Sequence, residues 1–169
     1  VRGCWPGAVG GKCCPGTGGH GGWMGGGGTH GEGKFRGSDG TGRIALGNTV
    51  RGVEARMAEG ISGGTETGAG NVISGNGLGI LVQSASPVLV KGNLIGTNAA
   101  GATVVPNLAG GIEVVSDNQI IGGTEPGAGN VVAGNFAHPG IMIAGSDNAI
   151  QGNFIGTNAA GTGALPNGI

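Results

Sequence analysis

Two aspartates are the side chains of this chain whose type and spacing could do chemistry. Asp117 and Asp147 stand 30 residues apart, and each lies within a Ser-Asp-Asn triplet. If the chain repeats with that period, the two carboxylates stack on neighbouring strands, about 5 Å apart. A pair at that separation would suit a retaining glycosidase or part of a calcium site. The competing interpretation is a turn, because Ser-Asp-Asn is ordinary turn sequence and any residue repeated in adjacent coils acquires this spacing.

The remaining polar residues form no recognisable catalytic or metal-binding motif. Glu66 and Glu125 recur in a G-G-T-E loop, and His138 is a lone histidine in another loop. The candidate metal ligands near the start of the chain are irregularly spaced, unlike the paired ligands of structural zinc sites; they are Cys4, Cys13, Cys14, His20 and His30. We therefore assign no catalytic residue and expect no cofactor, and Asp117 and Asp147 remain the candidates for catalysis or a metal.

Composition removes several classes of protein. Glycine accounts for 45 of the 169 residues, aromatic residues for 3% and charged residues for 10%, and there is no tyrosine. So much glycine excludes a helical bundle, because glycine destabilises helix interiors, and so few aromatics exclude an aromatic core. The net charge of −1 gives no drive toward nucleic acid or an anionic membrane. No apolar run reaches the roughly 18 residues that a membrane span needs.

Internal repeats organise the chain from residue 61 onward. The block 61–76, ISGGTETGAGNVISGN, returns at 120–135 as IIGGTEPGAGNVVAGN. The block 92–107, GNLIGTNAAGATVVPN, returns at 152–167 as GNFIGTNAAGTGALPN. The long unit is therefore about 60 residues, and a shared G-I-x-(V/I) pattern divides it into units of about 30 residues whose loops alternate.

Each unit holds three short apolar stretches, as at 80–82, 88–90 and 94–95. Ile80 and Val82 alternate with a residue of the opposite face, which predicts a strand, and glycine and asparagine between the stretches predict turns. Strands this short are unstable alone, but they become stable if each pairs with its copy in the next unit. The sequence therefore predicts an all-β parallel solenoid with one unit per coil.

When the coils stack, equivalent residues of successive units lie next to one another. The inner columns we expect are Ile80, Ile112 and Ile141 in one, and Val90, Ile120 and Ile150 in another. Slim aliphatic columns of this kind fill a narrow core without aromatic residues. Asparagines at the turns can stack into ladders of hydrogen-bonded amides; those at turn positions are Asn76, Asn93, Asn98, Asn130, Asn135, Asn153 and Asn158.

The motifs I-G-G-T-x-x-G-A-G-N-V-I-S-G-N and N-x-I-G-T-N-A-A-G-x-x-x-x-P-N resemble the repeats of right-handed parallel β-helix proteins of the pectin-lyase-like superfold. The variant is similar to repeats of large bacterial secreted and surface proteins, and the resemblance covers about residues 43–169. It implies a right-handed parallel β-helix and a secreted or cell-surface location. It selects no activity, because the superfold includes polysaccharide lyases, hydrolases, epimerases, adhesins and passive stalks.

Residues 1–40 carry none of these repeats but hold all three cysteines and both tryptophans. We expect them to form a glycine-rich, low-complexity leader that is disordered, because the segment cannot bury enough apolar surface to offset the entropy of ordering it. Residues 41–169 are expected to form the parallel β-helix, truncated at its C-terminus.

Charge in the repeats argues against the best-known activity of the superfold. Lys91 is the only cation in residues 61–169, and the acids there are Glu66, Glu113, Asp117, Glu125 and Asp147. A surface of this sign repels a polyanionic substrate, and no residue matches the catalytic motif of a lyase.

We therefore expect a fragment of a large extracellular bacterial solenoid with a structural or adhesive role, presenting loops on a rigid rod. The alternative is a segment of an enzyme that acts on polysaccharide. The expected partners are a polysaccharide or a cell-surface molecule and further coils of the parent protein, with no nucleic acid and no membrane insertion.

Overall fold

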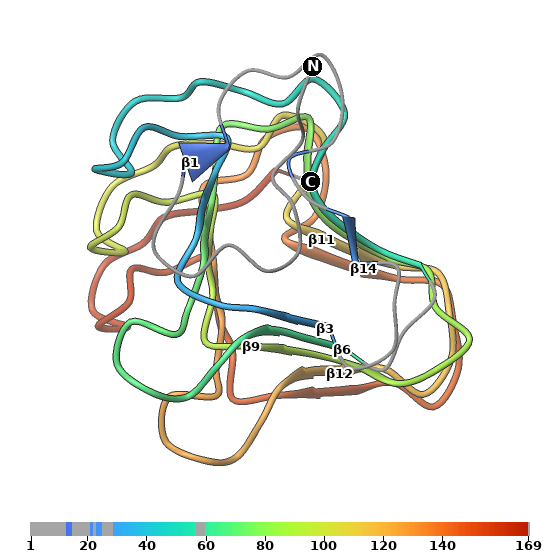
Figure 1. Cartoon of the computed structure of the whole chain (residues 1–169). Helices are drawn as coiled ribbons and strands as arrows, with labels where there is room; N and C mark the ends of the chain where they lie inside the picture. Colours follow the sequence, from blue (N-terminus) through green and yellow to red (C-terminus); the bar gives the residue numbers. More distant parts are fainter. Residues whose placement is uncertain (1–12, 15–20, 22, 25–28, 57–59, 169) are drawn as a thin grey trace.

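The computed structural model describes residues 13–14, 21, 23–24, 29–56 and 60–168. Within these residues the chain has strands and turns but no helix, and it winds into a parallel β-helix with three faces (Figure 1). Every pair of neighbouring strands is parallel. The predicted all-β parallel β-helix with about 30 residues per coil is confirmed.

The strands form three sheets, and each coil contributes one strand to sheet B, then C, then A. Sheet A contains β1 (Cys13–Cys14), β4 (Phe35–Arg36), β7 (Val72–Ile73), β10 (Leu94–Ile95), β13 (Val131–Val132) and β16 (Phe154–Ile155). Sheet B contains β2 (Trp23–Met24), β5 (Arg51–Ala55), β8 (Leu78–Val82), β11 (Ile112–Val114) and β14 (Ile141–Ile143). Sheet C contains β3 (Thr29–Gly31), β6 (Gly60–Gly63), β9 (Val88–Lys91), β12 (Ile120–Gly122) and β15 (Ala149–Gln151).

The core is a set of aliphatic columns that run along the axis of the solenoid. Ile80 pairs with Val53 on one side and with Ile112 on the other, and Ile112 pairs in turn with Ile141. This confirms the first predicted column. Val53, Ile80 and Ile112 are at most 1% exposed. Burial between coils therefore stabilises strands that are too short to persist alone.

The second predicted column is wrong by one residue. Val90 pairs with Ile121, not with Ile120, and Ile121 pairs with Ile150. The offset between this coil and the next is 32 residues at sheet B and 31 at sheet C, so the 30-residue spacing behind the prediction holds in neither sheet. Ile121 therefore takes the inner position and is fully buried.

Two asparagine ladders line the corners on either side of sheet A. One contains Asn71, Asn93, Asn130 and Asn153, and the other contains Asn48, Asn76, Asn107, Asn135 and Asn167. In each ladder the side-chain oxygen of one asparagine accepts hydrogen bonds from both the side chain and the backbone N–H of the asparagine one coil before it. Asn98 and Asn158 belong to neither ladder; their oxygens cap turns within projecting loops.

The loops at these two corners alternate from coil to coil (Figure 1). Loops from sheet C to sheet A, here called C–A loops, are long at 64–71 and 123–130 and short at 92–93 and 152–153. Loops from sheet A to sheet B, here called A–B loops, are long at 37–50, 96–111 and 156–168 and shorter at 74–77 and 133–140. A coil with a long loop at one corner thus has a shorter loop at the other, which gives the unit of about 60 residues.

Paired strands also occur on the N-terminal side of residue 41. β3 pairs with β6 and β4 pairs with β7. The loop that follows β4 closes with an isolated bridge, Ser38 to Ala45, that matches the bridges Thr97 to Val104 and Thr157 to Ala164. Residues 29–40 therefore belong to the coils, whereas most of the expected leader, 1–12, 15–20, 22 and 25–28, lies outside the described residues.

Candidate functional site

The two candidate aspartates lie in successive connections from sheet B to sheet C, but they are out of register. β11 pairs with β14 and β12 with β15 at an offset of 29 residues, so Asp117 falls opposite Ser146 and Asp147 falls opposite Asn118. The carboxylate of Asp117 accepts a hydrogen bond from the backbone N–H of Ser146 at 2.7 Å. The stacked pair expected from the 30-residue spacing is therefore not formed.

Both triplets make turns. Asn118 and Asp147 have φ angles of 59° and 55°, which asparagine and aspartate tolerate better than most residues. The buried Gln119 side chain donates a hydrogen bond to the carbonyl of Asp117 and accepts one from the N–H of Val88 at 2.8 Å. These hydrogen bonds fix the backbone conformation of the connection from sheet B to sheet C.

No other described residues supply a metal site. Nowhere in the described ranges do three His, Cys, Asp or Glu side chains gather closely enough to hold a metal ion. Cys4 and His20 lie outside the described residues, as do the side chains of Cys13, Cys14 and His30. The interpretation that this early set is no metal site therefore stays untested.

The outer face of sheet A forms a trough between two rows of loops. Its hollow of about 460 Å³ has Phe35, Val72 and Leu94 at its apolar base. Glu66 lines it from the long C–A loop 64–71, and Ala99 lines it from the long A–B loop 96–111. The long loops of the two corners therefore frame one surface.

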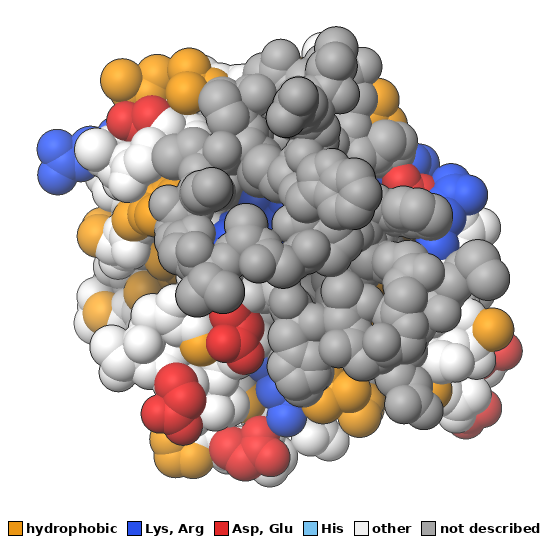
Figure 2. Space-filling view, viewed as in Figure 1, with side chains coloured by type: hydrophobic (Ala, Val, Ile, Leu, Met, Phe, Trp, Pro, Cys, Tyr) orange, Lys and Arg blue, Asp and Glu red, His pale blue; other side chains and the backbone are white. Residues whose placement is uncertain are grey.

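The G-G-T-E glutamates both lie on the long C–A loops. Glu125 is exposed and pairs with Lys91 at 3.2 Å between Oε2 and Nζ, so this lysine is not a free cation. Figure 2 shows acidic side chains at the lower left of the visible face, on the side where Figure 1 places the loops that follow sheet C. The rim of the trough at this corner therefore carries Glu66 and Glu125 together with Lys34 and Lys91.

A second hollow, of about 410 Å³, lies on the outer face of sheet B. Its apolar lining includes Val50, Leu78 and Met142, and its polar lining includes Arg51, Glu113 and His138. The sequence did not single out this groove, because these residues come from connections and strands of different coils. The stacking of Arg51 beside Leu78 in the register of β5 and β8 is the signal that could have found part of it.

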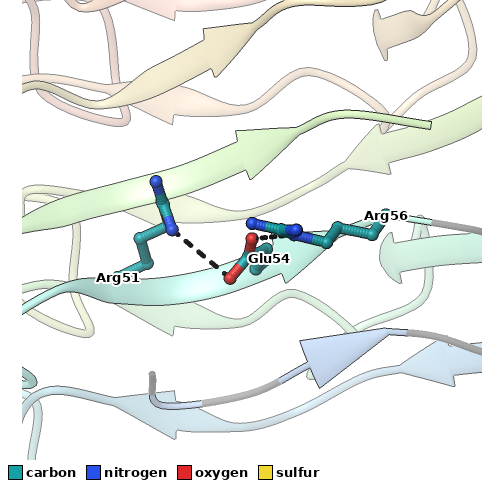
Figure 3. A network of polar contacts seen from close by, with 3 residues as sticks. All are labelled: Arg51, Glu54 and Arg56. Atoms are coloured by element: carbon teal, nitrogen blue, oxygen red, sulfur yellow. Dashed lines mark hydrogen bonds and ion pairs between the residues drawn. The ribbon is translucent and has the colours of Figure 1, made fainter. Parts of the chain in front are cut away.

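Next to this groove, a buried carboxylate is held between two arginines (Figure 3). Glu54 is 3% exposed; its carboxylate pairs with Arg51 Nη1 at 3.4 Å and with Arg56 Nε. Arg51 thus belongs to both the ion-pair network and the groove lining. The network neutralises a charge that would be costly to bury unpaired.

A second buried charge among the described residues lies in the core itself. Arg36 lies in the inner column of sheet A, where it pairs with Ile73, and Ile95 and Ile155 hold equivalent positions further along. Its Nη1 donates a hydrogen bond to the carbonyl of Gly21 at 3.1 Å, while its Nε has no partner. Burial lowers the pKa of the Arg36 guanidinium to about 10.

No protein-family model matches this chain, and neither a curated protein nor a solved structure is significantly similar to it. The class that the structure defines is therefore the parallel β-helix, on the evidence of its own strand pairing. None of the described segments is a helix that could cross a membrane.

Proposed function

We propose that this chain is part of an extracellular bacterial surface solenoid of the pectin-lyase-like type, whose role is to present loops on a rigid rod for adhesion. The observation that carries the proposal is the trough on sheet A, framed on both sides by loops that recur every second coil. A binding role needs a surface of fixed shape, and loops held by a rigid scaffold are where such surfaces usually form.

The loops themselves are held in place by backbone contacts between distant repeats. Ala159 N–H of one long A–B loop donates to the carbonyl of Gly101 in the preceding one at 2.9 Å. Within each loop one side-chain oxygen caps the turn, as Asn98 does for Ala102 and Thr103. Binding to such preformed loops requires little further ordering.

The trough favours a neutral or weakly charged partner. Its base is apolar, and the neighbouring corner carries acidic residues, with Lys91 engaged by Glu125. Phe35, Phe136 and Phe154 are the aromatic residues whose side chains the structure describes, and they form no row on which sugars could stack. We therefore expect a cell-surface protein or a neutral glycan rather than a polyanionic polysaccharide.

The test is a binding measurement on the full chain with a panel of neutral and acidic polysaccharides and intact cells. Ala99 is exposed and lines the trough, so Ala99→Arg should weaken binding at least about tenfold by occupying the hollow. Ala102→Arg is the matched control, because Ala102 is exposed on the same loop outside the lining of the hollow. Equal binding by both variants would contradict the trough as the binding surface.

A second candidate is an enzyme that acts on polysaccharide, with the groove on sheet B as its site. The specific observation is that a carboxylate, Glu113, and an imidazole, His138, line one groove beside Arg51. Such a pair can supply general acid and base groups. Release of new reducing ends from a polysaccharide, abolished by Glu113→Gln, would favour this function over adhesion.

A further inference from the structure

The last described coil, β14 to β16, exposes side chains whose counterparts in the preceding coil are core residues. Ile143, Ile150 and Ile155 are 37%, 40% and 48% exposed. Their partners one coil earlier are Val114, Ile121 and Val132, all fully buried. The same columns that bury apolar surface between coils therefore end in an apolar face that has strand edges on all three sides.

The asparagine ladders end on this face with a defined polarity. Asn130 donates its backbone N–H and its side-chain N–H to the oxygen of Asn153, and Asn135 does the same with Asn167. Asn153 and Asn167 have no following asparagine among the described residues. A matching surface must therefore bring an amide oxygen to each of these two positions.

Loop alternation adds a second requirement at the A–B corner. The short corner at Gly134 lies between two long A–B loops: its N–H donates to Leu165 O at 3.0 Å, and a Cβ there would approach Val104 Cγ2 to 2.7 Å. A long loop thus fills the height of two coils, its own and the space beside a shorter corner. A second long loop in the adjacent coil would need the same space, since coils are only about 4.8 Å apart.

The C–A corner follows the same rule. Gly92, at a short corner, is closed over by the carbonyls of Gly64 and Gly127, which belong to the long C–A loops of the coils before and after it. In the last coil the short corner is 152–153, and only the loop 123–130 is present on its earlier side. By the same rule, a coil that stacks on this corner would bring a long C–A loop to its other side.

We propose that the face formed by β14 to β16 is a docking surface for one type of coil. That coil has a long C–A loop, a short A–B loop and an asparagine at each corner, as in the coil of β11 to β13. A coil of the type of β8 to β10, with a long A–B loop, is rejected although its core residues and asparagines fit. The inference concerns the rod itself and does not depend on what its loops bind.

The experiment extends the full chain after residue 169 with a copy of one of its own coils. The matched extension copies residues 110–135, and the mismatched extension copies residues 79–107. Hydrogen exchange is measured at the backbone N–H groups of Asn153 and Asn167, with those of Ile95 and Ile121 as internal references for folding. The matched coil should slow exchange at Asn153 and Asn167 at least about tenfold, while the mismatched coil should leave it unchanged.

Two further extensions separate the parts of the proposal. Trimming the copied loop 96–105 of the mismatched coil to a short corner should restore protection, which shows that the loop and not the core causes rejection. Replacing the copies of Asn130 and Asn135 by alanine in the matched coil should reduce protection. If no extension slows exchange, the docking surface is wrong; if matched and mismatched coils protect equally, the selection by loop type is wrong.

Discussion

The early coils and the later coils place different chemistry in the same columns. In sheet A the inner position is Arg36 in β4 but Ile95 in β10. On the outer face of sheet B, Glu54 in β5 lies beside Leu81 in β8, and both side chains are buried. The backbone pairing continues through both regions, so the register of the solenoid does not depend on which side chain fills a column.

The difference shows how this fold admits a charge. Glu54 has two arginines as partners, whereas Arg36 has one carbonyl partner and an unpaired Nε. A buried ion in an apolar column is less stable than an aliphatic residue unless its hydrogen bonds are complete. The early coils therefore hold their register at a cost in stability that the later coils avoid.

Placing an arginine in the equivalent column of the later coils is the strongest test of this cost in stability. We expect Ile95→Arg to destabilise the chain by more than about 4 kcal/mol, because the new guanidinium would lie in a fully buried aliphatic column without a partner. Urea unfolding followed by circular dichroism measures the loss. Ile95→Val is the control, with an expected loss of about 1 kcal/mol. A stable Ile95→Arg chain would show that the columns accept charge freely.

The reverse exchange should stabilise the early coils. We expect Arg36→Ile to raise the free energy of unfolding by about 1–3 kcal/mol, since it replaces an incompletely bonded ion with the residue of the equivalent columns. The folded-state pKa, about 10, lies below the usual value of an arginine, so the charged form opposes folding throughout the range below pH 10 and stability recovers only above it.

The control for this exchange is Arg43→Ile, because Arg43 is an exposed arginine in the following loop. Its effect should stay within about 0.5 kcal/mol. The comparison is made at neutral pH by urea unfolding. A loss of stability in Arg36→Ile would mean that the guanidinium contributes more through Gly21 than its burial costs.

The comparison also explains how far the sequence could predict the structure. The blocks at 61–76 and 120–135 are nearly identical, so periodicity alone predicted the coils and the column through Ile80. A period of about 30 residues could not show that the offset between paired residues is 32 or 31 after β8 and β9 but 29 after β11 and β12. The 31-residue offset places Ile121 rather than Ile120 in the core, and the 29-residue offset of the next coil shifts Asp117 out of register with Asp147.

The early coils and the groove on sheet B were not predicted from the sequence, for a different reason. In β4 the residues Phe35-Arg36 stand where β10 has Leu94-Ile95. The repeat motif is therefore changed at this strand, although the backbone pairing is the same. The groove on sheet B is lined from several coils by residues that do not recur, such as Arg51 and His138. Repeated residues therefore predict the scaffold, whereas a site that occurs once produces no periodic pattern in the sequence.

Neutralising the paired charge should have a moderate effect. We expect Glu54→Gln to lower the free energy of unfolding by about 1 kcal/mol, because a buried carboxylate loses its charge while both arginines remain partly exposed. Glu113→Gln is the matched control on the same outer face, since Glu113 pairs with Leu81 as Glu54 does but is only partly buried. Urea unfolding of both variants gives the difference; equal effects would remove any special role for the arginine pair.

The smallest difference between the regions lies in the long A–B loops, where Asp39 caps the first turn and Asn98 caps the second. The pKa of Asp39 is lowered by hydrogen bonds from the Thr41 hydroxyl and from the backbone N–H groups of Ile44 and Arg43. Because its folded-state pKa is depressed, the cap is complete above the ordinary value of 3.8 and is lost as the pH falls through the lower folded-state value. Asp39→Asn should remove this dependence, since Asn98 makes the same backbone bonds without titrating. Amide chemical shifts of Arg43 and Ile44 between neutral and acid pH measure it, and an unchanged acid transition in the variant would assign the titration to another group.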